Sequence, residues 1–168
     1  IEVGPGTGNL TEKILEKKPS ELTVIEKDEK LSSFLNNKFK KNIKVINDDI
    51  LKVNANDYLN SENIIIFGNL PYNISTKILI NWIRKNDIEK FYKKLVLLFQ
   101  KEVADRIVAD YNTKYYSRIS IISNWKFNIK KIIDIAPESF FPKPKIKIIL
   151  LIFEPKKKVY NINNVKNL

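Results

Sequence analysis

Apolar positions recur along the chain with two different spacings, and these spacings predict strands that alternate with helices. Short apolar runs are typical of buried strands, whereas apolar residues three and four positions apart are typical of amphipathic helices. The predicted strands are residues 1–3, 21–26, 42–47, 63–67, 94–99, 127–135 and 145–153. The predicted helices are residues 10–18, 29–41, 75–85 and 100–111, with Ser75 as the N-cap of the third. Residues 117–125 fit a strand or a helix, and we favour a helix.

Repeated strand–helix units predict an α/β fold, with a mostly parallel sheet and helices on both of its faces. No internal repeat is visible, and no change in composition marks a domain boundary before about residue 154. We therefore expect one domain over residues 1–154 and the start of a linker in residues 155–168. Because residue 1 is not Met and residues 1–3 fit the end of a strand, we expect a fragment clipped at its N-terminus.

The composition narrows the possible chemistry. The chain has 168 residues, 43% of them apolar, and it contains neither cysteine nor histidine. Disulfides, thiolate nucleophiles, Cys/His zinc sites and imidazole bases are thereby excluded, and we expect no metal. No apolar run is long enough to span a bilayer, so we expect no membrane partner. Carboxylates, amides, hydroxyls, aromatic rings, backbone groups or a cofactor must supply the chemistry.

The net charge of +11 invites a nucleic-acid interpretation. Of the 30 basic residues 27 are Lys, which by itself suggests only an A/T-biased genome. Such a bias would act evenly, yet residues 1–72 carry 10 basic and 11 acidic groups, whereas residues 73–168 carry 20 and 8. The uneven distribution favours a polyanionic partner for the basic half.

A glycine loop follows the first strand and leads into the first helix, in "IEVGPGTGNLTEKI". Gly4, Gly6 and Gly8 have the spacing G-x-G-x-G, which differs from the G-x-G-x-x-G of a dinucleotide site. Glycine allows close approach of the backbone to a ligand, and a helix N-terminus offers unpaired N–H groups. Glu2 lies inside the preceding strand, and an acid there suits a cationic ligand better than a phosphate.

Two further strands end in acidic residues. Glu26, in "LTVIEKD", stands where a ribose-binding acid is found in such folds, and Asp48 or Asp49, in "NDDIL", has the acceptors to bind an adenine amine. Taken singly, each is as readily a solvated acid at a strand end. Together with Gly4–Gly8 they would share one carboxyl edge of a parallel sheet. An adenosine-bearing ligand without phosphates fits these groups, and S-adenosylmethionine is such a ligand.

The stretch "FGNLPYNIS" brings the fourth strand to the same edge. The N6 amine of adenine is a weak nucleophile because its lone pair is delocalised. The side-chain oxygen of Asn69 and the carbonyl of Leu70, fixed by Pro71, can hold its two N–H groups and aim the lone pair at a methyl donor. Tyr72 offers a face for the base, and Gly68 would let the turn approach the cofactor. The alternative is a proline-stopped strand whose tyrosine packs locally.

These stretches, with "LLFQKEVADRI" and "SFFPKPKIKI", resemble in order and spacing the ribosomal small-subunit RNA adenine dimethyltransferases. The resemblance covers nearly all of residues 1–154. It implies a Rossmann-like, seven-stranded methyltransferase fold with S-adenosylmethionine as donor and S-adenosylhomocysteine as product. It also implies dimethylation of two adjacent adenines in a hairpin near the 3′ end of small-subunit RNA. The family's segment before the first strand and its helical C-terminal domain are expected to be missing.

The resemblance also assigns residues. Gly4, Glu26, Asp49 and Asn69 match positions that contact the cofactor, and residues 69–72 match the motif that holds the target amine. Phe140 matches the aromatic residue that closes over the flipped base, although Phe141 beside it makes that match ambiguous. The "QKEVADR" helix is expected to support the sheet. Basic candidates for the RNA backbone are Lys101, Arg106, Arg118, Lys143 and Lys145.

Three alternatives remain at this point. They are a large-subunit RNA adenine methyltransferase of the macrolide-resistance type, an N6-adenine DNA methyltransferase and a non-catalytic nucleic-acid-binding relative. A non-catalytic factor could lose Asn69 or Tyr72 without penalty, so their presence favours an enzyme. The expected partner is small-subunit RNA within an immature 30S-type subunit, bound by a monomer. The expected location is the cytoplasm of a bacterium, or an organellar matrix if the source is eukaryotic.

Overall fold

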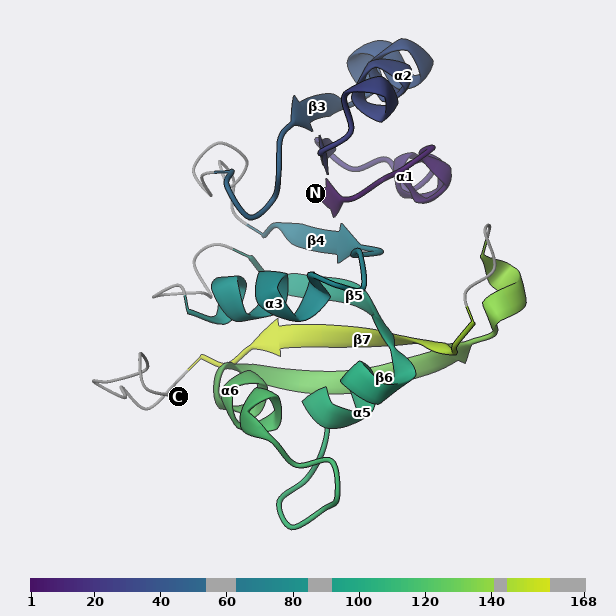
Figure 1. Ribbon diagram of the computed structural model, residues 1–168. Coiled ribbons are helices and arrows are strands. Elements are labelled where there is room, and N and C mark those ends of the chain that lie inside the picture. The colour runs from purple at the N-terminus through teal and green to yellow at the C-terminus, as the bar shows by residue number, and fades with distance from the viewer. Residues whose placement is uncertain (54–62, 85–91, 141–144, 158–168) are drawn as a thin grey trace.

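A computed structural model describes residues 1–53, 63–84, 92–140 and 145–157. Seven strands form one sheet in the order β3-β2-β1-β4-β5-β7-β6 (Figure 1). β7 is antiparallel to both of its neighbours, and the other strand pairs are parallel. The strands are β1 (Glu2–Val3), β2 (Thr23–Glu26), β3 (Lys44–Asn47), β4 (Ile65–Gly68), β5 (Lys94–Gln100), β6 (Phe127–Ile135) and β7 (Ile148–Pro155).

Helices cover both faces of this sheet, as two core clusters on β2 show. Successive strand residues point to opposite faces. Val24 packs with the apolar residues of the first two helices, whereas the next residue, Ile25, packs with those of the later helices. The α-helices are α1 (Asn9–Leu15), α2 (Glu29–Phe39), α3 (Ser75–Ile83), α5 (Lys101–Ile107) and α6 (Arg118–Lys126); η1 (Lys40–Asn42) and η3 (Pro137–Ser139) are 3₁₀ turns.

The larger core cluster holds the later strands and helices together. Phe153 of β7 makes edge-to-face contacts with Phe99 and Phe127, with ring centroids 6.1 and 5.5 Å apart. Such pairs add about 0.5–1.5 kcal/mol beyond the burial of their area. Ala104 and Ile107 of α5 are fully buried in the same cluster. The prediction that the "QKEVADR" helix supports the sheet is therefore confirmed.

The predicted fold class is confirmed, with corrections at element ends. The predicted helix 100–111 stops at Ile107, and the structure shows a helix for residues 118–126, where the sequence pattern left strand and helix open. Ser75 is wrong as an N-cap: Ile74 holds that position, and the Ser75 hydroxyl instead donates to the Tyr72 carbonyl at 3.2 Å. In the described ranges, no helix is long and apolar enough to cross a membrane.

The strand order sets the position of a ligand site. β1 pairs with β2 on one side and with β4 on the other. From β1 the chain builds outward to β2 and β3, and it then returns to the other side of β1 to form β4, so the strand order switches at this point. Ligands of open α/β sheets bind beyond the carboxyl ends of the strands at such a switch point. The segments that leave β1 and β4 are the glycine loop and the "NLPY" turn (Figure 1).

Candidate active site at the carboxyl edge of the sheet

The glycine loop and the "NLPY" turn lie against each other. Val3 is paired with Gly68 in the parallel ladder of β1 and β4, so both segments leave the sheet at the same level. A Cβ placed on Gly4 would lie 3.7 Å from the backbone oxygen of Asn69. The prediction that these two segments meet at one edge is thus confirmed for their backbones.

The glycine loop turns through left-handed backbone, with φ of 57° at Gly6 and 82° at Gly8. The two positions differ in their surroundings. A Cβ on Gly8 would lie 2.6 Å from the Phe39 ring of α2, whereas a Cβ on Gly6 would meet no atom within 4 Å. One side of the loop is therefore packed on α2, and the side at Gly6 faces open space.

Glu26 at the end of β2 fixes the loop from the neighbouring strand. Its Oε2 accepts a hydrogen bond from the Gly6 N–H at 3.2 Å, and its Oε1 accepts from the Asp28 N–H at 3.0 Å. The residue is only 8% exposed. Two carboxylate oxygens have about four acceptor sites, so Glu26 retains capacity for a ligand hydroxyl beside the loop.

Asp49 follows β3, the next strand outward. Its Oδ1 accepts the Leu51 N–H at 3.0 Å, and its Oδ2 lies 3.1 Å from the Lys27 ammonium. The Leu51 hydrogen bond, and after it Lys27, hold the pKa of Asp49 below its ordinary value. Asp49 is thus a charged acceptor at neutral pH, while the neighbouring Asp48 side chain accepts from the Asp49 N–H.

Glu2 is the buried acid of the site. It is 2% exposed, and the Thr11 hydroxyl of α1 donates to its Oε2 at 2.6 Å. Burial raises the pKa of Glu2, and the Thr11 hydrogen bond opposes that rise. Burial therefore favours the neutral form of Glu2, and the Thr11 hydrogen bond fixes the position of its carboxyl group in the strand that precedes the loop.

The "NLPY" turn exposes its first and last side chains and buries the second. Leu70 is 1% exposed, whereas Tyr72 is 38% exposed and Asn69 is exposed. A Cβ on Gly68 would lie 2.8 Å from the Leu70 Cδ2 and 3.1 Å from the Leu97 Cδ2. A side chain at position 68 would therefore press on the buried Leu70 and Leu97 side chains, a role for this glycine that the sequence did not predict.

Two acceptors of this turn remain available. The Pro71 carbonyl accepts from the Ile74 and Ser75 N–H groups, both at 3.0 Å, and the Tyr72 carbonyl accepts from the Ser75 hydroxyl. Among the described residues, neither the Asn69 side chain nor the Leu70 carbonyl has a hydrogen-bond partner. The turn therefore uses its last two carbonyls for its own hydrogen bonds, and it leaves the exposed Asn69 amide and the carbonyl of the buried Leu70 without partners among the described residues.

Phe140 lies beyond the same edge of the sheet. β6 runs parallel to β5, because β7 is antiparallel to both. η3 follows the carboxyl end of β6, and the Phe140 N–H donates to the Pro137 carbonyl at the end of that turn. The ring is half-buried. Phe141, the competing candidate, lies outside the described residues.

The basic candidates are spread over α5, α6 and the start of β7. Lys101 and Arg106 form ion pairs within α5, with Asp105 and Glu102 respectively. Arg118 and Lys145 are exposed. Lys143 lies outside the described residues.

Lys38 supports the glycine loop in a way that the sequence did not predict. From the last turn of α2 its ammonium donates to the Thr7 carbonyl at 3.1 Å and lies 2.8 Å from a Glu12 oxygen. Thr11, which bonds Glu2, was also missed. Thr11 could have been predicted, because a hydroxyl in the first turn after a glycine loop often bonds to the neighbouring strand. Lys38 could not, because it is 31 residues from the residue it bonds to.

Comparison with known proteins gives the family. The family model described as "Ribosomal RNA adenine dimethylase" matches residues 1–168. The chain belongs to the ribosomal RNA adenine dimethylase family. A curated relative from Pelagibacter ubique, named ribosomal RNA small subunit methyltransferase A, is 52% identical over all of this chain and 64% of its own length. A relative of the same name from Borreliella burgdorferi is 44% identical over 99% of this chain and 56% of its own.

The chain thus spans about three fifths of the length of these members of the dimethylase family. Among solved structures, a dimethyladenosine transferase from Plasmodium falciparum has a TM-score of 0.78 and 29% identity, covering 93% of this chain and 55% of its own. The 23S rRNA methyltransferase ErmE has a TM-score of 0.77 at 24% identity, covering 96% of this chain and 62% of its own, which shows a shared fold. The family resemblance seen in the motifs is confirmed.

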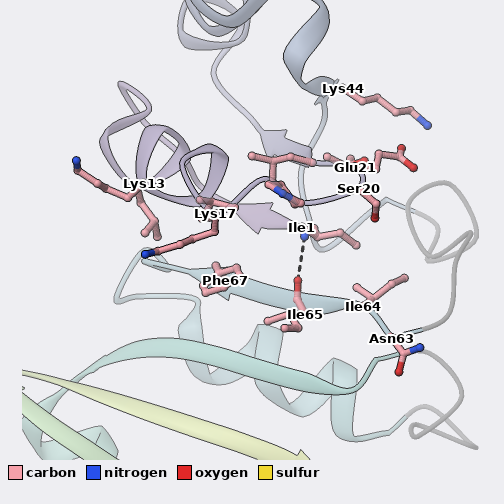
Figure 2. Close-up of a pocket in the computed structure, with 15 residues that line it drawn as sticks. Ile1, Lys13, Lys17, Ser20, Glu21, Lys44, Asn63, Ile64, Ile65 and Phe67 are labelled. Atoms are coloured by element: carbon pink, nitrogen blue, oxygen red, sulfur yellow. Dashed lines mark hydrogen bonds between the residues drawn. The ribbon is translucent and has the colours of Figure 1, made fainter.

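A separate cavity of about 620 Å³ lies near the opposite edge of the sheet, between α1 and the first residues of β2 and β4 (Figure 2). Its apolar wall includes Ile14, Leu22 and Phe67, and the amino group of Ile1 donates to the Ile65 carbonyl at 2.9 Å beside it. None of the residues that the sequence singled out for the dimethylase site lines it. Within the described ranges, no group of three or more acidic side chains could hold a metal ion.

The two glycine positions give a matched pair of variants. Gly6→Ala should lower the free energy of unfolding by about 1–2 kcal/mol, because alanine is strained in left-handed backbone. Gly8→Ala should cost that amount and, in addition, about 1–3 kcal/mol for the clash with Phe39. Urea denaturation followed by circular dichroism measures both. Equal losses for the two variants would contradict the packing of Gly8 on α2.

The buried acid gives a pH-dependent prediction. The pKa of Glu2 is higher in the folded state than in the unfolded state. Protonated Glu2 therefore stabilises the fold, fully below its unfolded pKa, and this stabilisation is lost as the pH rises through its folded pKa. The unfolding free energy of the wild type should therefore fall, relative to Glu2→Gln, from about pH 4.5 upward. Urea denaturation across pH 4–8 measures this difference. A difference that does not change with pH, or that favours the wild type as pH rises, would refute the assignment.

Proposed function

We propose that the protein is an S-adenosylmethionine-dependent methyltransferase that dimethylates the N6 amines of two adjacent adenines in small-subunit ribosomal RNA. Membership of the dimethylase family supports this proposal, and so does the chemistry of the site. The observation that carries it is the exposed Asn69 side chain beside the glycine loop, which, like the Leu70 carbonyl, has no hydrogen-bond partner in the part of the chain that the structure describes. In this proposal residues 1–154 are the catalytic domain and residues 155–168 are the start of a linker.

The residues at the strand ends fit the proposed cofactor. Glu26 has acceptor capacity for the ribose hydroxyls, and Asp49 has it for the adenine amine. The buried Glu2 and the glycine loop Gly4–Gly8 suit a cationic group with no phosphate. The cofactor, when bound, supplies a methyl group on a positively charged sulfur. The chain's own groups bind it, and none of them needs to react covalently.

The target amine is activated by orientation. Asn69 Oδ1 and the Leu70 carbonyl accept its two N–H groups, which favours a more tetrahedral nitrogen with a localised lone pair. With the cofactor bound, these two acceptors would aim the lone pair at its methyl group, and the surplus proton of the methylated amine would leave to water. Both acceptors stabilise the positive charge that develops on nitrogen. No general base is needed, which fits a chain without histidine.

Aromatic side chains hold the base. Tyr72 is partly exposed at the end of the turn, and we assign its ring to stacking on the target adenine. Stacking is worth about 1–3 kcal/mol per base, similar to the cost of unstacking it from the RNA. Phe140, beyond the carboxyl end of β6, is assigned to the other face. The exposed Lys101, Arg106, Arg118 and Lys145 are assigned, with Lys143, to the RNA backbone.

The small subunit is favoured over the large one by the relatives. The relatives at 52% and 44% identity are named for the small subunit. The large-subunit enzyme ErmE is only 24% identical, and its similarity supports a shared fold alone. Both of these relatives are bacterial, so we infer a cytoplasmic enzyme acting on immature small subunits. We take the enzyme to act as a monomer.

Labelled S-adenosylmethionine tests the function directly. The protein is incubated with immature small subunits, with large subunits and with adenine-containing DNA, and the label is located by nuclease digestion. We expect dimethyladenosine in small-subunit RNA only. Label confined to the large subunit or to DNA would overturn the proposal.

Removal of the amide tests the mechanism. Asn69→Ala should lower kcat by roughly 100-fold or more, since one of two acceptors for the amine is lost. RNA affinity, measured by filter binding, should change little. Asn37→Ala, an exposed amide on α2, is the matched control and should keep wild-type rates. A near-normal kcat for Asn69→Ala would refute the orienting role.

A further inference from the structure

Three tyrosines are exposed on the short segment that joins α5 to α6. Tyr111 is 82% exposed, Tyr115 45% and Tyr116 37%. Single exposed apolar residues are common on protein surfaces, but a cluster of aromatic rings marks an interaction site. Figure 1 shows the segment projecting from the body of the molecule beside these two helices.

The backbone of this segment is fixed by its own hydrogen bonds. The Asp110 carbonyl accepts from the Thr113 hydroxyl at 2.7 Å, and the Tyr116 N–H donates to the Thr113 carbonyl at 3.0 Å. The Tyr111 and Tyr116 rings pack edge to face, with centroids 5.6 Å apart. The rings are therefore held in place before any partner binds, which lowers the entropy cost of binding.

The charges around the rings are mixed and include two cations: Asp110 directly precedes Tyr111, and Lys114 and Arg118 lie in or next to the segment. The Lys114 ammonium lies 5.8 Å from the centre of the Tyr115 ring. Arg118, at the start of α6, is exposed and has no ion pair within the described residues. Lys101 and Arg106 are each paired with an acid on α5. The surface thus offers flat rings with two free cations, a combination that suits stacked bases more than a run of phosphates.

The helix that leads into this segment, α5, starts at the carboxyl edge of the sheet. α5 begins directly after β5, so Lys101 marks that edge. The pKa of Lys101 is raised first by its hydrogen bond to Asp105, and also by Asp134 of β6 and by Tyr115. Tyr115 is thus within electrostatic range of the carboxyl ends of β5 and β6. The proposed target site, with Asn69 and Phe140, lies along the same edge.

We propose that Tyr111, Tyr115 and Tyr116 form a stacking surface for unpaired RNA bases that flank the target adenine, an inference that rests on the proposed function. Every base has a π-face, so such a surface accepts bases without reading their identity. An RNA strand that leaves the target pocket along the edge from β4 toward β6 would pass the start of α5 and run toward the rings. Lys114 and Arg118 neutralise one phosphate each.

Binding of RNA with and without unpaired bases tests this surface. The probes are a fluorescein-labelled hairpin with a single-stranded, adenine-containing loop and a fully paired RNA duplex of the same length. Fluorescence anisotropy gives Kd for the wild type, Tyr111→Ala, Tyr115→Ala and the double variant. Each Ala variant should weaken binding of the hairpin about tenfold. Binding of the duplex should change by less than about twofold, because its bases are not free to stack.

Two controls separate stacking from charge and from folding. Tyr111→Phe and Tyr115→Phe keep the rings and should retain wild-type Kd. The slope of log Kd against log salt should be unchanged in the Tyr→Ala variants, whereas Arg118→Gln should reduce it by about 0.7–0.9. Because the rings are exposed, the thermal midpoints of all variants should stay close to that of the wild type.

The proposal is overturned if the double variant binds the hairpin as the wild type does, if hairpin and duplex weaken equally, or if Phe does not restore affinity. These readouts need no methyl transfer, so they stand apart from the proposed function. Transfer by the wild type to immature subunits decides that function separately. If the stacking surface and the proposed function are both correct, the Tyr→Ala variants should show a raised KM for RNA and an unchanged kcat.

Discussion

The parallel pairing of β1 with β4 is the constraint on which the site depends. This two-residue ladder places Val3 beside Gly68, and the chain leaves both strands at one level. The glycine loop and the "NLPY" turn are therefore in contact, although more than 60 residues separate them. A methyl donor held by one segment and an amine held by the other can meet only if this pairing is kept. The buried side chain of Leu70, under the glycine at position 68, secures the turn to the same core.

Electrostatics then select the ligand. Three carboxylates, Glu2, Glu26 and Asp49, come from three adjacent strands, and each is fixed by at least one hydrogen bond. A phosphate at this edge would meet the negative charge of Asp49 and find only acidic side chains among these three, whereas a cationic nucleoside would be attracted to them. The basic residues concentrate in the second half of the chain, on the side that we assign to RNA. In the proposed function, the acidic edge residues would bind the cofactor and the basic half of the chain would face the RNA.

Much of this was predictable because its signals are local. The strand–helix alternation gave the fold class, and the glycine spacing, Glu26, Asp49 and residues 69–72 were visible as short motifs. What was missed depends on distant packing. Lys38 bonds to Thr7, 31 residues away. A side chain on Gly68 would meet Leu97 of the neighbouring strand as well as Leu70. The helix α5 ends before the tyrosine segment. No periodicity in a sequence reports which remote side chain fills a given space.

The central claim is that an amide oxygen and a carbonyl, held beside the methyl donor, orient the target amine. A crystal structure of the protein with S-adenosylhomocysteine and an adenine-containing RNA hairpin tests it most directly. The account predicts Asn69 Oδ1 and the Leu70 carbonyl oxygen at about 3 Å from N6, a hydrogen-bonding distance, with the Tyr72 ring stacked on the base. An Asn69 side chain that points away from the cofactor, with no room for a purine between them, would contradict it.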